Sequence, residues 1–189
     1  MRRTRIALFA LLVLCAASFG PAAASANPGR AAFALSSAAF ADGGMIPKVH
    51  DCASSGDGDP GKKNESPPLA WSGAPEQAKS YAIVLHDLDN GIIHWVVYDI
   101  PANIAGLPQN IDHVYQPTVP AGSRQAYYRG SANFFGYQGP CTTNHTYEWA
   151  VHALNKESLT ELGSASSTQA AEAAIDAATI ATASLRGSS

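Results

Sequence analysis

Carboxylates and imidazoles stand close together in the stretch HDLDNGIIHWVVYDIP, residues 86–101. Asp87 and Asp89 are two residues apart and can point the same way, and His94 on a returning strand can lie opposite them. A carboxylate beside an imidazole favours the protonated ring and fixes its orientation. Such a ring can donate to a phosphate or a carboxylate. The alternative is the solvated tip of an ordinary hairpin, where Asp, Asn and Gly are common.

A second stretch, FFGYQGPCTTNHTYEW at residues 134–149, carries the other candidate residues. Gly139 and Pro140 belong to a loop whose backbone N–H groups could face an anion. His145 comes just before a strand, and Tyr147 follows two residues later on the same face. The alternative is a Gly-Pro turn with a surface histidine. If the two stretches meet in space, they form two walls of one site.

Other chemistries receive less support. The histidines and aspartates include metal ligands, but no HExxH or comparable spacing places them on one element, so we expect no metal and no cofactor. No G-x-S-x-G elbow supports a serine hydrolase. Cys141 could be a nucleophile only if it is not bridged. Asn144-His145-Thr146 matches a glycosylation sequon, which matters only in a eukaryotic host.

Strand patterns surround both stretches. SYAIVLHD (80–87) and HWVVYDI (94–100) are joined by a turn that contains Asn90-Gly91, a strong hairpin signal. TYEWAVHAL (146–154) is a further strand. Residues 53–68 read as a loop, and 70–79 and 102–124 as irregular segments. The order of strands and long loops indicates a mainly β fold with an antiparallel sheet.

Helical signals are confined to the region after residue 155. Ser158–Glu161 looks like a capping box that opens a short helical turn. The Ala-rich segment 167–180 is predicted to be helical, and 181–187 to be a last strand. The fold class is therefore mainly β with one helix near the C-terminus, and not a doubly wound parallel sheet.

The N-terminal region has the pattern of a secretory signal peptide, residues 1–26. Arg2, Arg3 and Arg5 precede a short apolar run, and Ala24-Ser25-Ala26 fits the cleavage rule. A lipoprotein acylated at Cys15 is the alternative, but large residues precede that cysteine. Residues 27–189 then form a single domain of 163 residues, exported to the periplasm or secreted.

Net charge and hydropathy argue against nucleic-acid binding and against a membrane-spanning segment in the mature chain. Removal of the three arginines changes the formal net charge from −3 to −6, so we expect no nucleic-acid partner. No later segment is apolar for long enough to span a membrane.

The remaining cysteines, Cys52 and Cys141, are expected to pair in an exported domain, although two buried free thiols are the alternative. A bridge closing about 90 residues would stabilise the fold by about 4–5 kcal/mol.

The segments together resemble the phosphatidylethanolamine-binding protein family, also called Raf kinase inhibitor proteins, and most closely its bacterial secreted branch. The matching stretches, in the family's order, are AFADGGMIPKVHDC, SPPLAWSGAPEQAKSYAIVLHDLD, HWVVYDIPANIAGLP and GYQGPC…HTYEWAVHAL. The resemblance implies a large antiparallel sheet packed on a smaller one, and it supports the Cys52–Cys141 bridge. It also implies a small anion site, whose residues here are Asp87, Asp89, His94, Gly139, Pro140, His145 and Tyr147.

The sequence departs from the family at the site itself. Leu88 stands where the family usually has Pro, Ile93 replaces an aromatic residue, and the segment from Asp89 to His94 is shorter. Thr142-Thr143 replaces a Pro-Pro pair, and Thr146 replaces an arginine. The resemblance therefore implies an anion site here, but it does not identify the ligand.

Three functional hypotheses follow. The first is a binding protein for a small anionic or phosphorylated ligand, in which Asp87 either orients an imidazole or accepts from an amino or hydroxyl group of the ligand. The second is an acid/base enzyme acting on a phosphoester or ester with the same groups. The third is an inhibitor or regulator whose partner would be a protease or a kinase-like target.

Overall fold

The computed structural model describes residues 31–53, 58–128 and 134–189. The expected signal peptide, residues 1–26, lies outside these ranges. The elements in chain order are β1 (Ala34–Ser37), β2 (Gly44–Met45), the 3₁₀ turn η1 (Lys48–His50), β3 (Leu69–Ser72), β4 (Ser80–Asp87), β5 (Ile93–Pro101), β6 (Gly106–Leu107), β7 (Arg124–Gln125), β8 (Thr146–Leu154), α1 (Thr168–Ala178) and β9 (Thr179–Ser188).

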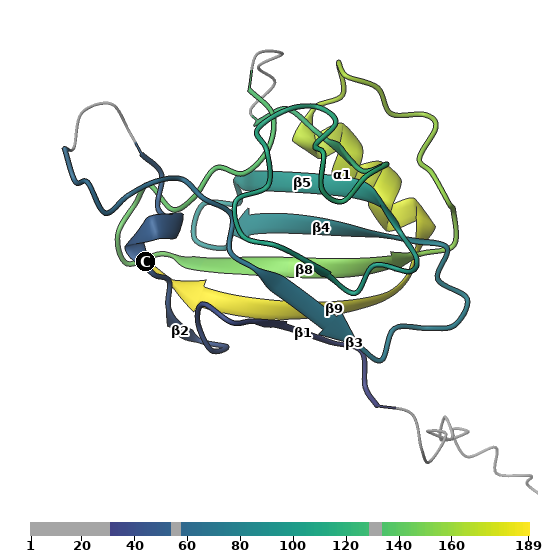
Figure 1. Ribbon diagram of the computed structural model, residues 1–189, viewed down its shortest axis with the longest axis horizontal. Coiled ribbons are helices and arrows are strands. Elements are labelled where there is room, and N and C mark those ends of the chain that lie inside the picture. The colour runs from purple at the N-terminus through teal and green to yellow at the C-terminus, as the bar shows by residue number, and fades with distance from the viewer. Residues whose placement is uncertain (1–30, 54–57, 129–133) are drawn as a thin grey trace, which may run out of the picture.

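Two sheets form the fold (Figure 1). The larger has six strands in the order β2-β9-β8-β4-β5-β7, and the smaller has three in the order β1-β3-β6. All pairs are antiparallel except the short β2–β9 pair. The predicted fold class is confirmed: a mainly β protein with a large sheet, a smaller sheet and one helix near the C-terminus. The end of β9 pairs with β2, the short strand that precedes η1 in the chain (Figure 1).

The centre of the large sheet is buried on both faces, and the alternation along β4 shows why. Ile83 and Leu85 join the cluster between the sheets, which also contains Trp71 of β3. Ala82 and Val84 point the other way and pack with residues of α1. Because both faces of β4 are covered, its sequence is apolar almost throughout, as expected for a central strand.

Helix α1 is set by its cap and its apolar stripe. The side chain of Ser167 accepts a hydrogen bond from the Ala170 N–H at 3.2 Å, which satisfies one free donor of the first turn. Ala171, Ile175 and Ala178 are buried against the sheet. In the described ranges, no helix combines the length and hydropathy that a membrane crossing needs.

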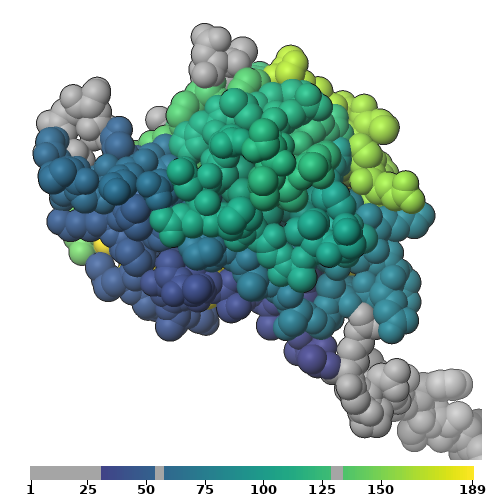
Figure 2. Space-filling model, in the orientation of Figure 1, coloured from purple at the N-terminus to yellow at the C-terminus, as the bar shows by residue number. Residues whose placement is uncertain are grey.

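Three short strands lie in segments that the sequence led us to expect as irregular: β3, β6 and β7. In β3 the buried residues Leu69 and Trp71 alternate with exposed neighbours, but four residues are too few for a clear period. β6 and β7 have only two residues each. In the space-filling view, the teal-green connection between β6 and β7 covers much of the face turned to the viewer (Figure 2).

A buried ion pair holds the connection between β8 and α1 against β5. Arg124 bonds the Asp99 carboxylate through both Nε and Nη2, and also donates to the Leu159 carbonyl at 3.0 Å. Ser158 Oγ donates to Asp99 at 2.8 Å and accepts from Arg124 Nη2 at 3.1 Å, so the contacts of this hydroxyl are with the ion pair and not those of the cap that the sequence suggested. The turn itself forms, closed by the hydrogen bond from Leu162 N–H to Leu159 O at 2.9 Å.

Cys52 and Cys141 form the expected disulfide, with a Cα–Cα distance of 5.1 Å across a sequence separation of 89. The alternative of two free thiols is wrong, and so is Cys141 as a nucleophile. The bridge joins the segment after η1 to the loop that precedes β8. That loop carries three of the candidate residues, Gly139, Pro140 and His145.

Candidate functional site

Strand pairing brings the two candidate stretches together. β8 pairs with β4 in a register that places Asp87 opposite Tyr147. The register continues one step beyond the strand, because the Leu88 N–H donates to the Thr146 carbonyl at 2.8 Å. His145 therefore lies beside the tip of the β4–β5 hairpin, although 58 positions separate it from Asp87. The expectation that the two stretches meet in space is confirmed.

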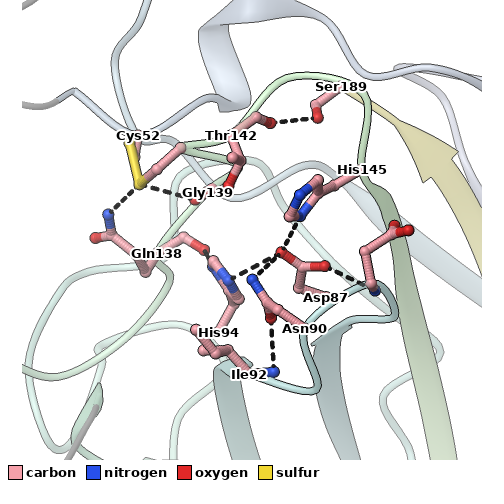
Figure 3. Close-up of polar contacts among 12 residues, drawn as sticks. Cys52, Asp87, Asn90, Ile92, His94, Gln138, Gly139, Thr142, His145 and Ser189 are labelled. Carbon is pink, nitrogen blue, oxygen red and sulfur yellow. Dashed lines mark hydrogen bonds and ion pairs between the residues drawn. A yellow bond between two sulfur atoms is a disulfide. The ribbon is translucent and has the colours of Figure 1, made fainter.

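Asp87 is the centre of the group. Its side chain is fully buried, and it accepts three hydrogen bonds (Figure 3). Oδ1 accepts from the Asp89 N–H at 3.0 Å, and Oδ2 accepts from Asn90 Nδ2 at 2.8 Å and from His145 Nδ1 at 2.7 Å. Burial alone would raise the pKa of this carboxyl, but the hydrogen bonds from His145 and Asp89, and the charges of His145 and His94, outweigh burial and lower it. Asp87 is therefore ionised at neutral pH.

His145 is the more accessible of the two imidazoles, with 23% of its side chain exposed. Since Nδ1 faces the carboxylate of Asp87, Nδ1 carries the proton in the neutral ring. The other nitrogen, Nε2, is then the atom left to face a ligand. When the ring is protonated, Nε2 becomes a charged hydrogen-bond donor held in a fixed orientation by Asp87.

His94 closes the group from the β5 side. Its Nδ1 lies 3.1 Å from the Gln138 carbonyl, and its Nε2 is 4.0 Å from Asp87 Oδ2. Only 5% of the side chain is exposed. The ring meets Tyr147 edge-on, with 5.3 Å between centroids. Packing and the Gln138 contact therefore aim His94 at the same carboxylate that holds His145.

Tyr147 and Asp89 have different surroundings. Tyr147 is fully buried, and burial, with the Asp87 charge added, raises its pKa to about 12. It packs next to both His94 and His145. Asp89 is exposed, and its Oδ2 accepts from the Thr146 N–H at 2.6 Å. Tyr147 thus supports the imidazoles, and Asp89 ties the hairpin tip to β8.

The Gly139–Pro140 loop does not use the Gly139 N–H as the sequence suggested. That N–H donates to Asn64 Oδ1 at 2.8 Å, so it is not among the loop N–H groups that are left to face an anion. Gly139 is instead required for close approach: a Cβ there would lie 1.9 Å from the His50 carbonyl oxygen. Pro140 O accepts from the Cys52 N–H at 2.8 Å. The loop is a support that fixes the Gln138 carbonyl under His94.

Sequence reasoning missed two supporting residues, Asn64 and Asn90. Asn64, at a positive φ of 55°, bonds the Gly139 N–H through Oδ1 and the Tyr137 carbonyl through Nδ2. No local pattern marks it, because its partners lie more than 70 residues away. Asn90 was recognised as a turn residue only, yet its amide closes over Asp87.

Three of the candidate groups could also approach a metal ion. One ligand atom each from Asp87, Asp89 and His145 lies within 4.8 Å of the others. In the structure, however, hydrogen bonds within the chain already use the Asp87 and Asp89 carboxylates.

The fold and site define a class: a two-sheet β protein with a buried carboxylate beside two imidazoles at one end of the large sheet. The family model for phosphatidylethanolamine-binding proteins matches residues 36–189, and the chain belongs to this family. A UPF0098 protein of Methanothermobacter thermautotrophicus is 36% identical over 126 residues, covering 64% of this chain and 76% of the relative. The UPF0098 protein YbcL of Escherichia coli is 35% identical over 104 residues, covering 51% and 56%.

Solved structures agree with this assignment. The crystal structure of E. coli YbcL, described as a member of the mammalian PEBP family, matches with a TM-score of 0.72 and 30% identity over 83% of this chain and 97% of that chain. A homologue from Chlamydia trachomatis matches with a TM-score of 0.64 and 27% identity, covering 84% and 97%. Membership in a family of ligand-binding proteins does not favour the acid/base enzyme.

Proposed function

We propose that the chain binds a small phosphate-bearing or carboxylate-bearing ligand beside His145 and His94, and that it acts after export. The observation that carries the proposal is the hydrogen bond between Asp87 and His145 Nδ1 at 2.7 Å. A buried, ionised carboxylate stabilises the protonated imidazole and fixes its direction. The half-buried ring can then present Nε2–H to an oxyanion. A hydrogen bond to a charged group contributes about 1.5–3 kcal/mol.

The net charge of the site depends on the protonation of its imidazoles, and this sets the pH at which an anion can bind. Asp87 and Asp89 bring two negative charges to the site, and two neutral imidazoles would leave them uncompensated. An anion therefore binds well only when the imidazoles are protonated. Affinity is expected to rise as pH falls through the histidine range.

Titration calorimetry with sulfate tests this proposal, because sulfate keeps its charge across the histidine range and so isolates the titration of the protein. We expect tighter sulfate binding at about pH 5.5 than at about pH 7.5. His145→Ala should weaken binding about 10- to 100-fold at the lower pH. His86→Ala is the matched control, since His86 is on the same strand as Asp87 but pairs with Glu172 of α1. Affinity that stays flat or rises toward neutral pH contradicts the proposal.

Export is supported by the pattern of residues 1–26 and by the disulfide, which belongs to oxidising compartments. Intact-mass measurement on protein recovered from its host checks it. The expected mature chain begins at Asn27 and carries a closed bridge. A chain that retains residues 1–26 with two reduced thiols would contradict export.

A further inference from the structure

Donors from its own chain occupy three of the acceptor positions of the buried Asp87 carboxylate. A carboxylate has about four acceptor positions, two on each oxygen. Oδ2 accepts from Asn90 Nδ2 and His145 Nδ1, and Oδ1 accepts from the Asp89 N–H. The side chain has no exposed surface. A ligand ammonium group therefore finds no accessible acceptor on Asp87 unless the hairpin tip opens.

Asn90 is the residue that closes this carboxylate. Its Nδ2 bonds Asp87, while its Oδ1 accepts from the Ile92 N–H at 2.9 Å. Both ends of the amide are thus used inside the hairpin, and the short turn holds the amide over Oδ2 (Figure 3).

Asp89, the other carboxylate of the site, is a weak alternative partner for an ammonium group. Its Oδ2 is used by the Thr146 N–H, and its side chain is exposed. An ion pair in water is screened and gains little, because both charges keep most of their hydration when apart. Such a pair changes an affinity by no more than about fivefold.

Accordingly, we propose that this site recognises the phosphate group alone and does not discriminate among the groups esterified to it, so that an ethanolamine substituent adds no affinity. Asp87 is a positioning residue that acts through His145 and does not touch the ligand. This inference rests on the proposed function, because it concerns which part of a phosphorylated ligand the same site reads.

The test compares methyl phosphate, phosphocholine and phosphoethanolamine by titration calorimetry on the full chain. All three are phosphate monoesters. Methyl phosphate has no cationic group, phosphocholine has a cation without N–H donors, and phosphoethanolamine has a primary ammonium group. We expect the three dissociation constants to agree within about fivefold. Phosphoethanolamine binding more than about tenfold tighter than both others would overturn the inference while leaving the anion site intact. If methyl phosphate fails to bind at all, the phosphate-binding part of the proposed function fails, and the inference fails with it.

Two variants separate the roles of the carboxylates. Asp87→Asn should weaken all three ligands by the same factor, since it acts through the orientation of His145. A loss confined to phosphoethanolamine would show that Asp87 meets the ammonium group. Asp89→Asn should leave the order of the three affinities unchanged, and a preference for phosphoethanolamine that vanishes in this variant would overturn the proposal.

Two phosphodiesters test whether the phosphate group belongs to a lipid headgroup or to a free metabolite. Glycerophosphoethanolamine and glycerophosphocholine repeat the amine comparison on a lipid headgroup, and equal affinities are expected again. Tighter binding of the monoesters would identify a free metabolite as the natural ligand. Tighter binding of the diesters would identify a lipid headgroup. A clear preference for the ethanolamine diester over the choline diester would contradict the inference.

Discussion

Substituting Gly139 by alanine tests whether the support loop is as tightly packed as the structure shows. The added Cβ would lie 1.9 Å from the His50 carbonyl oxygen and 2.9 Å from its carbonyl carbon. These are backbone atoms, so no change of rotamer relieves the overlap, and the two segments must separate by about 1 Å. Gly139 does not have a positive φ, so the cost is steric and not conformational.

The magnitude follows from what this separation disturbs. Overpacking at a close contact costs about 1–3 kcal/mol. The hydrogen bonds from Gly139 N–H to Asn64 and from the Tyr137 hydroxyl to the His50 carbonyl cross the same contact, and each contributes about 1 kcal/mol. Because some of these bonds will stretch without breaking, we expect Gly139→Ala to lower the free energy of unfolding by about 2–4 kcal/mol.

Urea denaturation at neutral pH measures this change, and thermal unfolding should show a midpoint about 5–15 °C lower. Gly163→Ala is the matched control, because a Cβ at Gly163 meets nothing within 4 Å. That variant should stay within about 0.5 kcal/mol of the wild type. If both alanine variants have the same stability, the close approach of Gly139 to His50 is not a real constraint and the account of the loop is wrong.

Three further predictions concern groups that hold the fold and site together. Arg124→Met should lower the free energy of unfolding by about 3–5 kcal/mol, because it leaves the buried Asp99 carboxylate without its cationic partner. Urea denaturation measures this change, and a loss below about 1 kcal/mol would contradict the prediction. Replacing Cys52 and Cys141 by serine should cost about 4–5 kcal/mol, and dithiothreitol should destabilise the wild type but not the double variant. The pKa of Asp87 is lowered by folding, so its ionisation stabilises the fold above its unfolded pKa of about 3.9, and that contribution is lost as pH falls through the folded value. The stability difference between wild type and Asp87→Asn should therefore shrink below about pH 4 in acid denaturation, and a constant difference would count against the shift.

The elements with clear periodicity were predicted correctly from sequence. β4, β5, β8 and β9 are long enough for alternation to be visible, and Ser167 with the Ala-rich segment after it marks α1. β3, β6 and β7 were missed because two to four residues do not establish a period. Tertiary pairing across the small sheet and at the edge of the large one determines them, and this does not appear in a local pattern.

The site was predictable as a set of residues but not as a set of contacts. Asp87, His94 and His145 came from residue type and from the family resemblance, and the structure brings them together. The direction of the Gly139 N–H and the role of Asn64 could not be predicted, since both depend on the packing of two loops 75 residues apart. Single-sequence reasoning has no information about such contacts.

The most direct measurement of the central claim is nitrogen NMR of the histidine side chains during a sulfate titration. We expect neutral His145 to carry its proton on Nδ1, facing Asp87, and we expect sulfate to shift the Nε2 resonance of His145. Asp87→Asn should abolish the Nδ1-protonated preference. A neutral His145 protonated on Nε2, or a sulfate response that leaves His145 unchanged, would contradict the claim that Asp87 prepares this imidazole to receive an anion.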